Sequence, residues 1–158
     1  MTPFNVAIVR WVRGAFRFGG RSSRSEYWWP RLLVFGVNAV CVATILNSLD
    51  PAQLQTLVEA LQSDPTEPLK LDVGYADLSS PARFAFVFAI VFSVLTFIPN
   101  LAVSWRRFHD LGRPGWFHLL FLFLGGSMPL IALAEYVWLA FPGTDGTNRF
   151  GADPRQVR

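Results

Sequence analysis

The sequence predicts an all-α integral membrane protein, a helical bundle with three transmembrane helices and an amphipathic helix at the membrane interface before them. Hydrophobic residues make up 52% of the 158 residues and charged residues only 16%, which is too apolar for a surface solvated by water. Charged side chains are also nearly absent from residues 32–49, 84–105 and 115–141. Stretches of this length suit membrane helices, so we expect a single membrane domain over residues 1–158.

The amino-terminal segment predicts an interfacial helix over residues 4–18. Phe4, Ile8 and Trp11 recur at helical spacing, while Arg10 and Arg13 fall on another face. Such a helix can place its apolar face in the acyl boundary and its arginines against anionic headgroups. The arginines also interrupt any cleavable signal pattern, so we expect the first span to act as an uncleaved signal.

Three spans are expected. The first covers residues 30–49 and starts with a proline suited to a first helical turn, and the second covers residues 82–105. The third, residues 116–141, would be roughly 40 Å long as a helix, enough for one tilted crossing and too short for two. Gly125 and Pro129 predict a bend near its middle, so a re-entrant hairpin remains the alternative to a full crossing.

The loops give an orientation. Six arginines lie within residues 1–31, before the uncharged part of the first span, whereas the acidic loop over residues 50–80, in which Leu54 to Leu61 predict a short helix, is poor in basic residues. The basic turn over residues 106–115 carries three arginines. By the positive-inside rule we expect the amino terminus and this turn in the cytoplasm and the acidic loop outside. The tail, residues 142–158, would lie outside after three crossings and inside after a hairpin.

Three polar motifs border these spans: residues 16–28, residues 106–116 and residues 143–154. In order and in spacing from the spans, they resemble the bacterial inner-membrane family known as domain of unknown function 805. The Arg-x-His-Asp-x-Gly-Arg turn is the most specific of the three. The resemblance covers nearly the whole chain and implies a bacterial inner-membrane location. It implies no activity, since none comes with the family, and the long acidic loop departs from compact members.

Ten polar residues are candidates for a functional role. Arginines fit phosphate geometry, so the motif residues are candidates for lipid-headgroup binding, with an internal ion pair or a headgroup anchor as the alternative. Glu135 is an ionisable residue within a proposed span and therefore a further candidate. The motif candidates are Arg21, Arg24, Glu26, Arg106, Arg107, His109, Asp110, Arg113 and Asn148.

The sequence predicts no enzyme, no cofactor, no metal site and no nucleic-acid partner. It has no recognisable nucleophile pattern and no phosphate-cradling glycine loop, and its two histidines and one cysteine cannot complete a four-ligand zinc site. We expect a non-enzymatic membrane component that assembles with itself, with other membrane proteins or with anionic lipids. The alternative is a small oligomeric transporter or channel that uses Glu135 or the Arg106 cluster.

Overall fold

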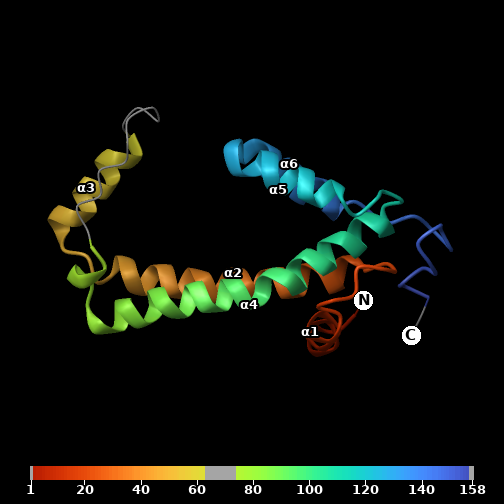
Figure 1. The fold of residues 1–158 in the computed structure, drawn as a ribbon, viewed down its shortest axis with the longest axis horizontal. Coiled ribbons are helices and arrows are strands. Elements are labelled where there is room, and N and C mark those ends of the chain that lie inside the picture. Colours follow the sequence, from red (N-terminus) through yellow and green to blue (C-terminus); the bar gives the residue numbers. More distant parts are fainter. Residues whose placement is uncertain (1, 63–73, 157–158) are drawn as a thin grey trace. The chain divides into compact units, whose positions relative to one another are not determined.

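The computed structural model describes residues 2–62 and 74–156, and within them the chain is helical, as predicted. The part of the acidic loop over residues 63–73, expected to be irregular, lies outside the described residues. No strand occurs in the described part, where the only β-type pairing is an isolated bridge between Asn148 and Gly151. The elements are α1 (Phe4–Arg13), α2 (Arg24–Leu46), α3 (Pro51–Gln62), η1 (Tyr75–Asp77), α4 (Ser80–Asp110), α5 (Phe117–Ser127) and α6 (Pro129–Ala140) (Figure 1).

The first long helix, α2, begins six residues before the expected start of the first span at residue 30. Its start is a reciprocal cap: the Glu26 amide donates to Ser23 Oγ at 3.4 Å, and the Ser23 amide donates to Glu26 Oε2 at 3.1 Å. Pro30 therefore lies inside the helix rather than in its first turn. The Ser-x-x-Glu pattern was the signal for this earlier start.

The second long helix, α4, runs on to Asp110 and so includes the first half of the segment expected as a basic turn. The helix ends there because Gly112, with a φ of 72°, takes the left-handed conformation that glycine favours. Arg106 and Arg107 thus stand on a helix, which fixes the directions in which their side chains point.

The amino-terminal helix, α1, is shorter than the expected interfacial helix and ends at Arg13 instead of residue 18. Gly14 closes it with an amide that donates to the Arg10 carbonyl at 2.9 Å. Ala7 and Trp11 are buried against the protein, while Val12 is exposed, so only part of the apolar surface remains for lipid. Of the two aromatic residues on the expected apolar face, Trp11 is buried and Phe4 is 47% exposed, so this face packs against the protein only in part.

The third apolar stretch differs from the expected single helix over residues 116–141. It contains two short helices, α5 and α6, that pack side by side (Figure 1). Met128 between them is extended, and Pro129 has no N–H group to continue the first helix. A Cβ on Gly125 would lie 3.0 Å from Ala132 Cβ, so the missing side chain lets the two helices approach closely.

The chain divides into two compact units. The first comprises Met1–Val34 and Val94–Arg158, and its buried core joins Trp11 of α1, Tyr27 of α2, Phe108 of α4 and Leu139 of α6. This packing brings both ends of the chain's described part, the start of α2 and the end of α4 into one body.

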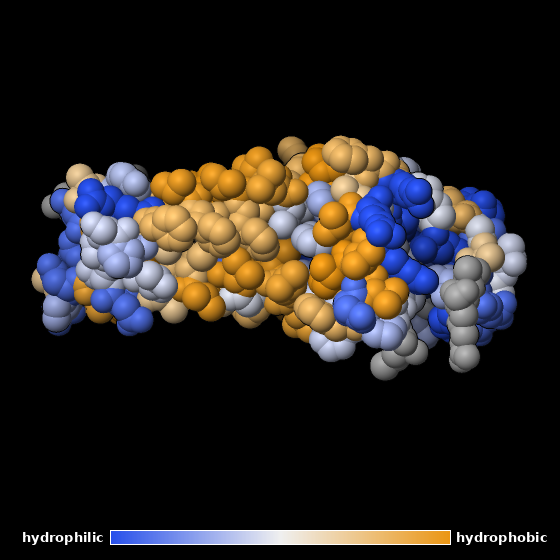
Figure 2. Space-filling view, turned by 90° about the horizontal axis from the view of Figure 1, so that it is seen from below, coloured by the Kyte–Doolittle hydropathy of each residue, from blue (hydrophilic) through white to orange (hydrophobic). Residues whose placement is uncertain are grey.

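The second unit, Phe35–Ser93, contains the later part of α2 and the earlier part of α4 and exposes many large hydrophobic side chains. Phe35 and Phe84 are each 73% exposed, and Figure 2 shows hydrophobic residues over much of the visible face. Both α2 and α4 are long and apolar enough to cross a membrane. Of the residues in the most apolar 18-residue segment of each helix, only 11% are buried in α2 and 17% in α4. Core helices of a soluble protein would be mostly buried, so these surfaces fit contact with lipid.

Candidate functional site

A buried ion cluster centred on Asp110 lies at the end of α4. Arg21 Nε donates to Asp110 Oδ1 at 2.9 Å, and Arg21 Nη2 lies 2.8 Å from the same oxygen. Arg107 donates to Asp110 Oδ2. The side chains of both arginines have no exposed surface, and that of Asp110 is 5% exposed. Each carboxylate oxygen is thus held by a guanidinium, which is the arrangement that a buried carboxylate needs.

Arg21 binds the tail as well as Asp110. Its Nη1 donates to the carbonyls of Gly146 at 2.5 Å and Gly151 at 3.4 Å, and its Nη2 donates to the Thr144 carbonyl at 2.5 Å. A guanidinium has five N–H donors, and four of them make these hydrogen bonds and the one to Asp110, in a side chain with no exposed surface. Arg21 is therefore not accessible to a lipid phosphate and instead fastens the tail to α4.

Arg107 binds backbone carbonyls at the end of α6, as Arg21 binds those of the tail. Arg107 donates to the Leu139 carbonyl at 2.9 Å and to the Phe141 carbonyl, which lie at the end of α6. These carbonyls have no partner within their own helix, so Arg107 acts as a side-chain cap.

Arg106 serves the connection between α1 and α2. It donates through Nη1 to the carbonyls of Gly14 at 2.7 Å and Arg17 at 2.5 Å, and through Nε to Ser22 Oγ at 3.0 Å. The guanidinium thereby satisfies the backbone of a segment with no regular structure of its own.

His109 and Asn148 join the turn to the tail. The His109 ring stacks on Phe150 at 4.0 Å with an interplanar angle of 3°, and its Nδ1 lies 3.0 Å from the Gly20 carbonyl. Asn148 donates to the His109 carbonyl at 3.0 Å and to Thr144 Oγ1 at 2.9 Å. His109 and Asp110 are adjacent in the chain, but the side chain of His109 contacts Gly20 and Phe150, whereas that of Asp110 contacts two arginines.

The structure therefore brings the three sequence motifs together around Asp110. Glu26 is also engaged, since it caps α2 and forms an ion pair with Arg10. Arg24 and Arg113 differ from the rest because their side chains are exposed. Arg113 lies over the Trp138 ring at 5.9 Å, and Arg24 borders a cavity.

In the tail, Asp153 and Arg155 form a tight pair. Hydrogen bonds from the Arg155 side chain and amide hold the pKa of Asp153 well below its usual range, and those bonds in turn raise the pKa of Arg155. Both groups thus stay charged at neutral pH. Among residues 2–62 and 74–156, no three His, Cys, Asp or Glu side chains gather that could hold a metal ion.

Glu135, the ionisable candidate within the third apolar stretch, is buried and paired with His118 of α5. Glu135 Oε1 lies 2.5 Å from His118 Nδ1, and both residues are 7% exposed. The contact joins α5 to α6 across the hairpin, so a polar partner inside the protein accounts for a carboxyl group in an apolar helix. Sequence reasoning missed His118 because the two residues are neighbours only when the stretch folds back.

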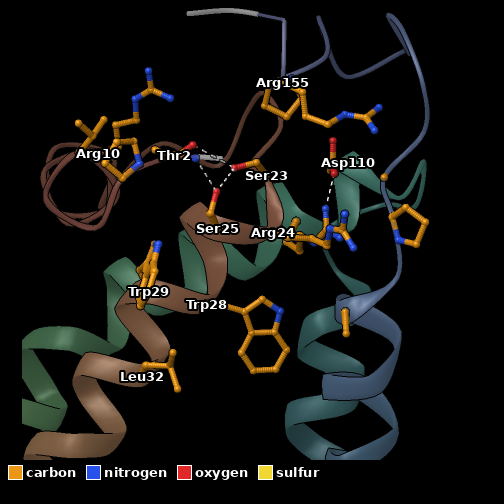
Figure 3. Close-up of a pocket in the computed structure, with 17 residues that line it drawn as sticks. Thr2, Arg10, Ser23, Arg24, Ser25, Trp28, Trp29, Leu32, Asp110 and Arg155 are labelled. Carbon is orange, nitrogen blue, oxygen red and sulfur yellow. Dashed lines mark hydrogen bonds and ion pairs between the residues drawn. The ribbon is translucent and has the colours of Figure 1, made fainter.

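A cavity of about 880 Å³ lies beside the Asp110 cluster. It is bounded by the start of α1, the first turns of α2, the end of α4 and the tail (Figure 3). Its lining includes Arg24 and Ser25 near the start of α2 and Trp28, Trp29 and Leu32 farther along that helix. The cavity therefore joins a basic, hydroxyl-bearing end to an apolar end.

Comparison with known proteins gives a matching family and two kinds of relatives from Escherichia coli. The chain matches the family described as "Protein of unknown function (DUF805)" over residues 15–152. It is 40% identical to the inner membrane protein YhaH of Escherichia coli strain K12 over 70 residues, which cover 44% of this chain and 54% of YhaH. It is 30% identical to the inner membrane protein YhaI of the same strain over 139 residues, 87% of this chain and 86% of YhaI. The chain thus spans about half the length of YhaH, and no solved structure matches it.

Proposed function

Because this chain belongs to the DUF805 family, in which YhaH and YhaI are inner membrane proteins, we propose that it is a non-enzymatic inner-membrane component that binds anionic lipids. The binding surface would be the cytoplasmic end of the protein, where the three motifs gather. The observation that carries this proposal is their convergence on Asp110, since it supports one common side of the membrane for all three.

The convergence supports a specific path through the membrane. If α2 and α4 both cross, the chain returns at Asp110 to the side on which it started. The third apolar stretch begins at Phe117, whose ring packs near Phe108, and it ends at carbonyls that Arg107 binds. Both of its ends are thus on the Asp110 side. The eleven residues of α5 span roughly 16 Å, about half of the hydrocarbon core. We infer two crossings and a re-entrant hairpin in place of three crossings.

Exposed arginines on this side supply the attraction for anionic lipid. They sit apart from the buried cluster, and none of them belongs to the Asp110 ion pairs. A basic residue near an anionic surface contributes about 1 kcal/mol, so several together give stable attachment. This set consists of Arg13, Arg17, Arg24, Arg113 and Arg149.

The path is tested with reporters fused after Asp64 and after Arg158. We expect a periplasm-dependent phosphatase to be active after Asp64, and a fluorescent protein that matures in the cytoplasm to fluoresce after Arg158. With two crossings, the tail lies on the same side of the membrane as the amino terminus and the basic turn, and the loop that contains Asp64 lies on the other side. Phosphatase activity after Arg158 would instead require three crossings and would contradict the proposed path.

The lipid preference is tested on the full-length protein purified in detergent and equilibrated with equal amounts of phosphatidylglycerol and phosphatidylcholine. Native mass spectrometry should show phosphatidylglycerol adducts favoured about tenfold, which corresponds to about 1.4 kcal/mol. Part of this preference should fall as the salt concentration rises, because exposed charges are screened. Equal retention of the two lipids would refute lipid binding as the function.

A further inference from the structure

The cavity beside Asp110 lies wholly within the first compact unit, and its lining changes character along α2. Arg24, Ser25, Trp28, Trp29 and Leu32 follow one another at spacings that keep them on one side of a helix. Figure 3 shows Ser25 near the helix start, the two tryptophans one turn on and Leu32 beyond them. Over roughly 12 Å of helix, the wall passes from charged and hydroxyl groups to aromatic and then aliphatic groups.

The charges at the polar end favour an anion. Of the four arginines in the lining, Arg10 is paired with Glu26, Arg107 with Asp110, and Arg155 with Asp145 and Asp153. Arg24 is exposed, and no hydrogen bond or ion pair within residues 2–62 and 74–156 occupies its guanidinium. Asp110, the acidic group in the lining, is already held by two arginines.

The apolar end distinguishes a lipid from a small soluble anion. Trp29 is 38% exposed and Leu32 is 53% exposed, so this wall offers apolar surface that inorganic phosphate cannot use. A cavity of about 880 Å³ is in the range that holds a ligand larger than a phosphate ion. A glycerophospholipid has the matching order of groups, with an anionic phosphate at one end and acyl chains at the other.

We propose that this cavity is a binding site for one anionic glycerophospholipid, with the phosphate at Arg24 and the Ser25 hydroxyl and the upper acyl chains along Trp28, Trp29 and Leu32. This inference rests on the proposed lipid function and narrows it from a basic surface to one site. Arg24 acts as the bidentate phosphate donor, since its fork of N–H groups fits two phosphate oxygens.

The test compares Arg24→Gln with Arg13→Gln in the full-length protein, using the same phosphatidylglycerol and phosphatidylcholine mixture. Both variants remove one exposed arginine from the same end of the protein, but Arg13 does not line the cavity. At a salt concentration that screens exposed charges, we expect Arg24→Gln to bind phosphatidylglycerol about tenfold more weakly than wild type. Arg13→Gln, whose contribution to the exposed basic set is screened under these conditions, should lose about twofold at most. Leu32→Gln, which spoils the apolar wall and leaves Arg24 in place, should weaken binding as well.

The outcomes separate the site from the general function. If the wild type prefers phosphatidylglycerol but Arg24→Gln and Arg13→Gln lose the same amount of binding, the cavity is not the binding site. The lipid would then bind to a diffuse basic surface. Competition by inorganic phosphate at the concentration of the lipid, with no effect of Leu32→Gln, would overturn the lipid in favour of a soluble anion. Absence of any wild-type preference would overturn the proposed function and this site together.

Discussion

Replacing Asp110 by alanine is expected to lower the free energy of unfolding by about 3–5 kcal/mol, the usual cost of removing one member of a buried ion cluster. The loss is large because Arg21 and Arg107 both lose the carboxylate with which they are paired and remain buried with uncompensated charge. The change should be read from denaturant unfolding of the detergent-solubilised protein. Asp110→Asn should be intermediate, since an amide oxygen still accepts a hydrogen bond but carries no charge.

Asp145→Ala is the matched control for Asp110. Asp145 also pairs with an arginine, but its side chain is 94% exposed, and exposed pairs contribute little to stability. The control should unfold nearly as wild type does. If Asp110→Ala unfolded at the same denaturant concentration as the control, the cluster would not be what holds the three motifs together.

Gly143→Ala is the second change with a large expected effect. A Cβ at this position would lie 1.9 Å from Asp110 Oδ2, far inside contact distance, so the tail or the carboxylate must move. Overpacking of this kind costs about 1–3 kcal/mol, and here it also disturbs the ion cluster. We expect lower resistance to denaturant and earlier proteolysis of the tail in detergent.

Gly19→Ala controls for the loss of a glycine, because a Cβ there meets nothing within 4 Å. A double-mutant cycle adds a sharper readout. In an Asp110→Ala background the obstructing carboxylate is gone, so adding Gly143→Ala should cost much less than it does in the wild type. Fully additive effects would show that the strain at Gly143 arises elsewhere.

Composition and helical spacing predicted much of the architecture. The all-helical class is confirmed, and the short helix of the acidic loop was expected from the spacing of Leu54 and Leu61 and is observed as Pro51–Gln62. The apolar cores of α2 and α4 also coincide with the first two expected spans. These features depend on local pattern alone, which a single sequence displays directly.

Long-range contacts could not be predicted in the same way. An arginine beside an apolar segment has one sequence pattern whether it faces a phosphate or, like Arg21, a set of backbone carbonyls 123–130 residues away. The third apolar stretch was equally ambiguous, since its length allowed one helix and only Met128 and Pro129 at the break decide for two. The pairing of His118 with Glu135 then depends on that fold-back.

The hydrogen bonds from Arg21 to the tail can form only in a certain order during biosynthesis. Arg21 donates to the carbonyls of Thr144, Gly146 and Gly151, and the ribosome synthesises these three residues long after Arg21. While the ribosome elongates the chain, Arg21 and Asp110 can meet once α4 has formed, but the remaining donors stay hydrated until residue 151 emerges. Completion of the contacts around Arg21 is thus a late step, and a nascent chain arrested before that residue would leave donors of Arg21 without their backbone acceptors.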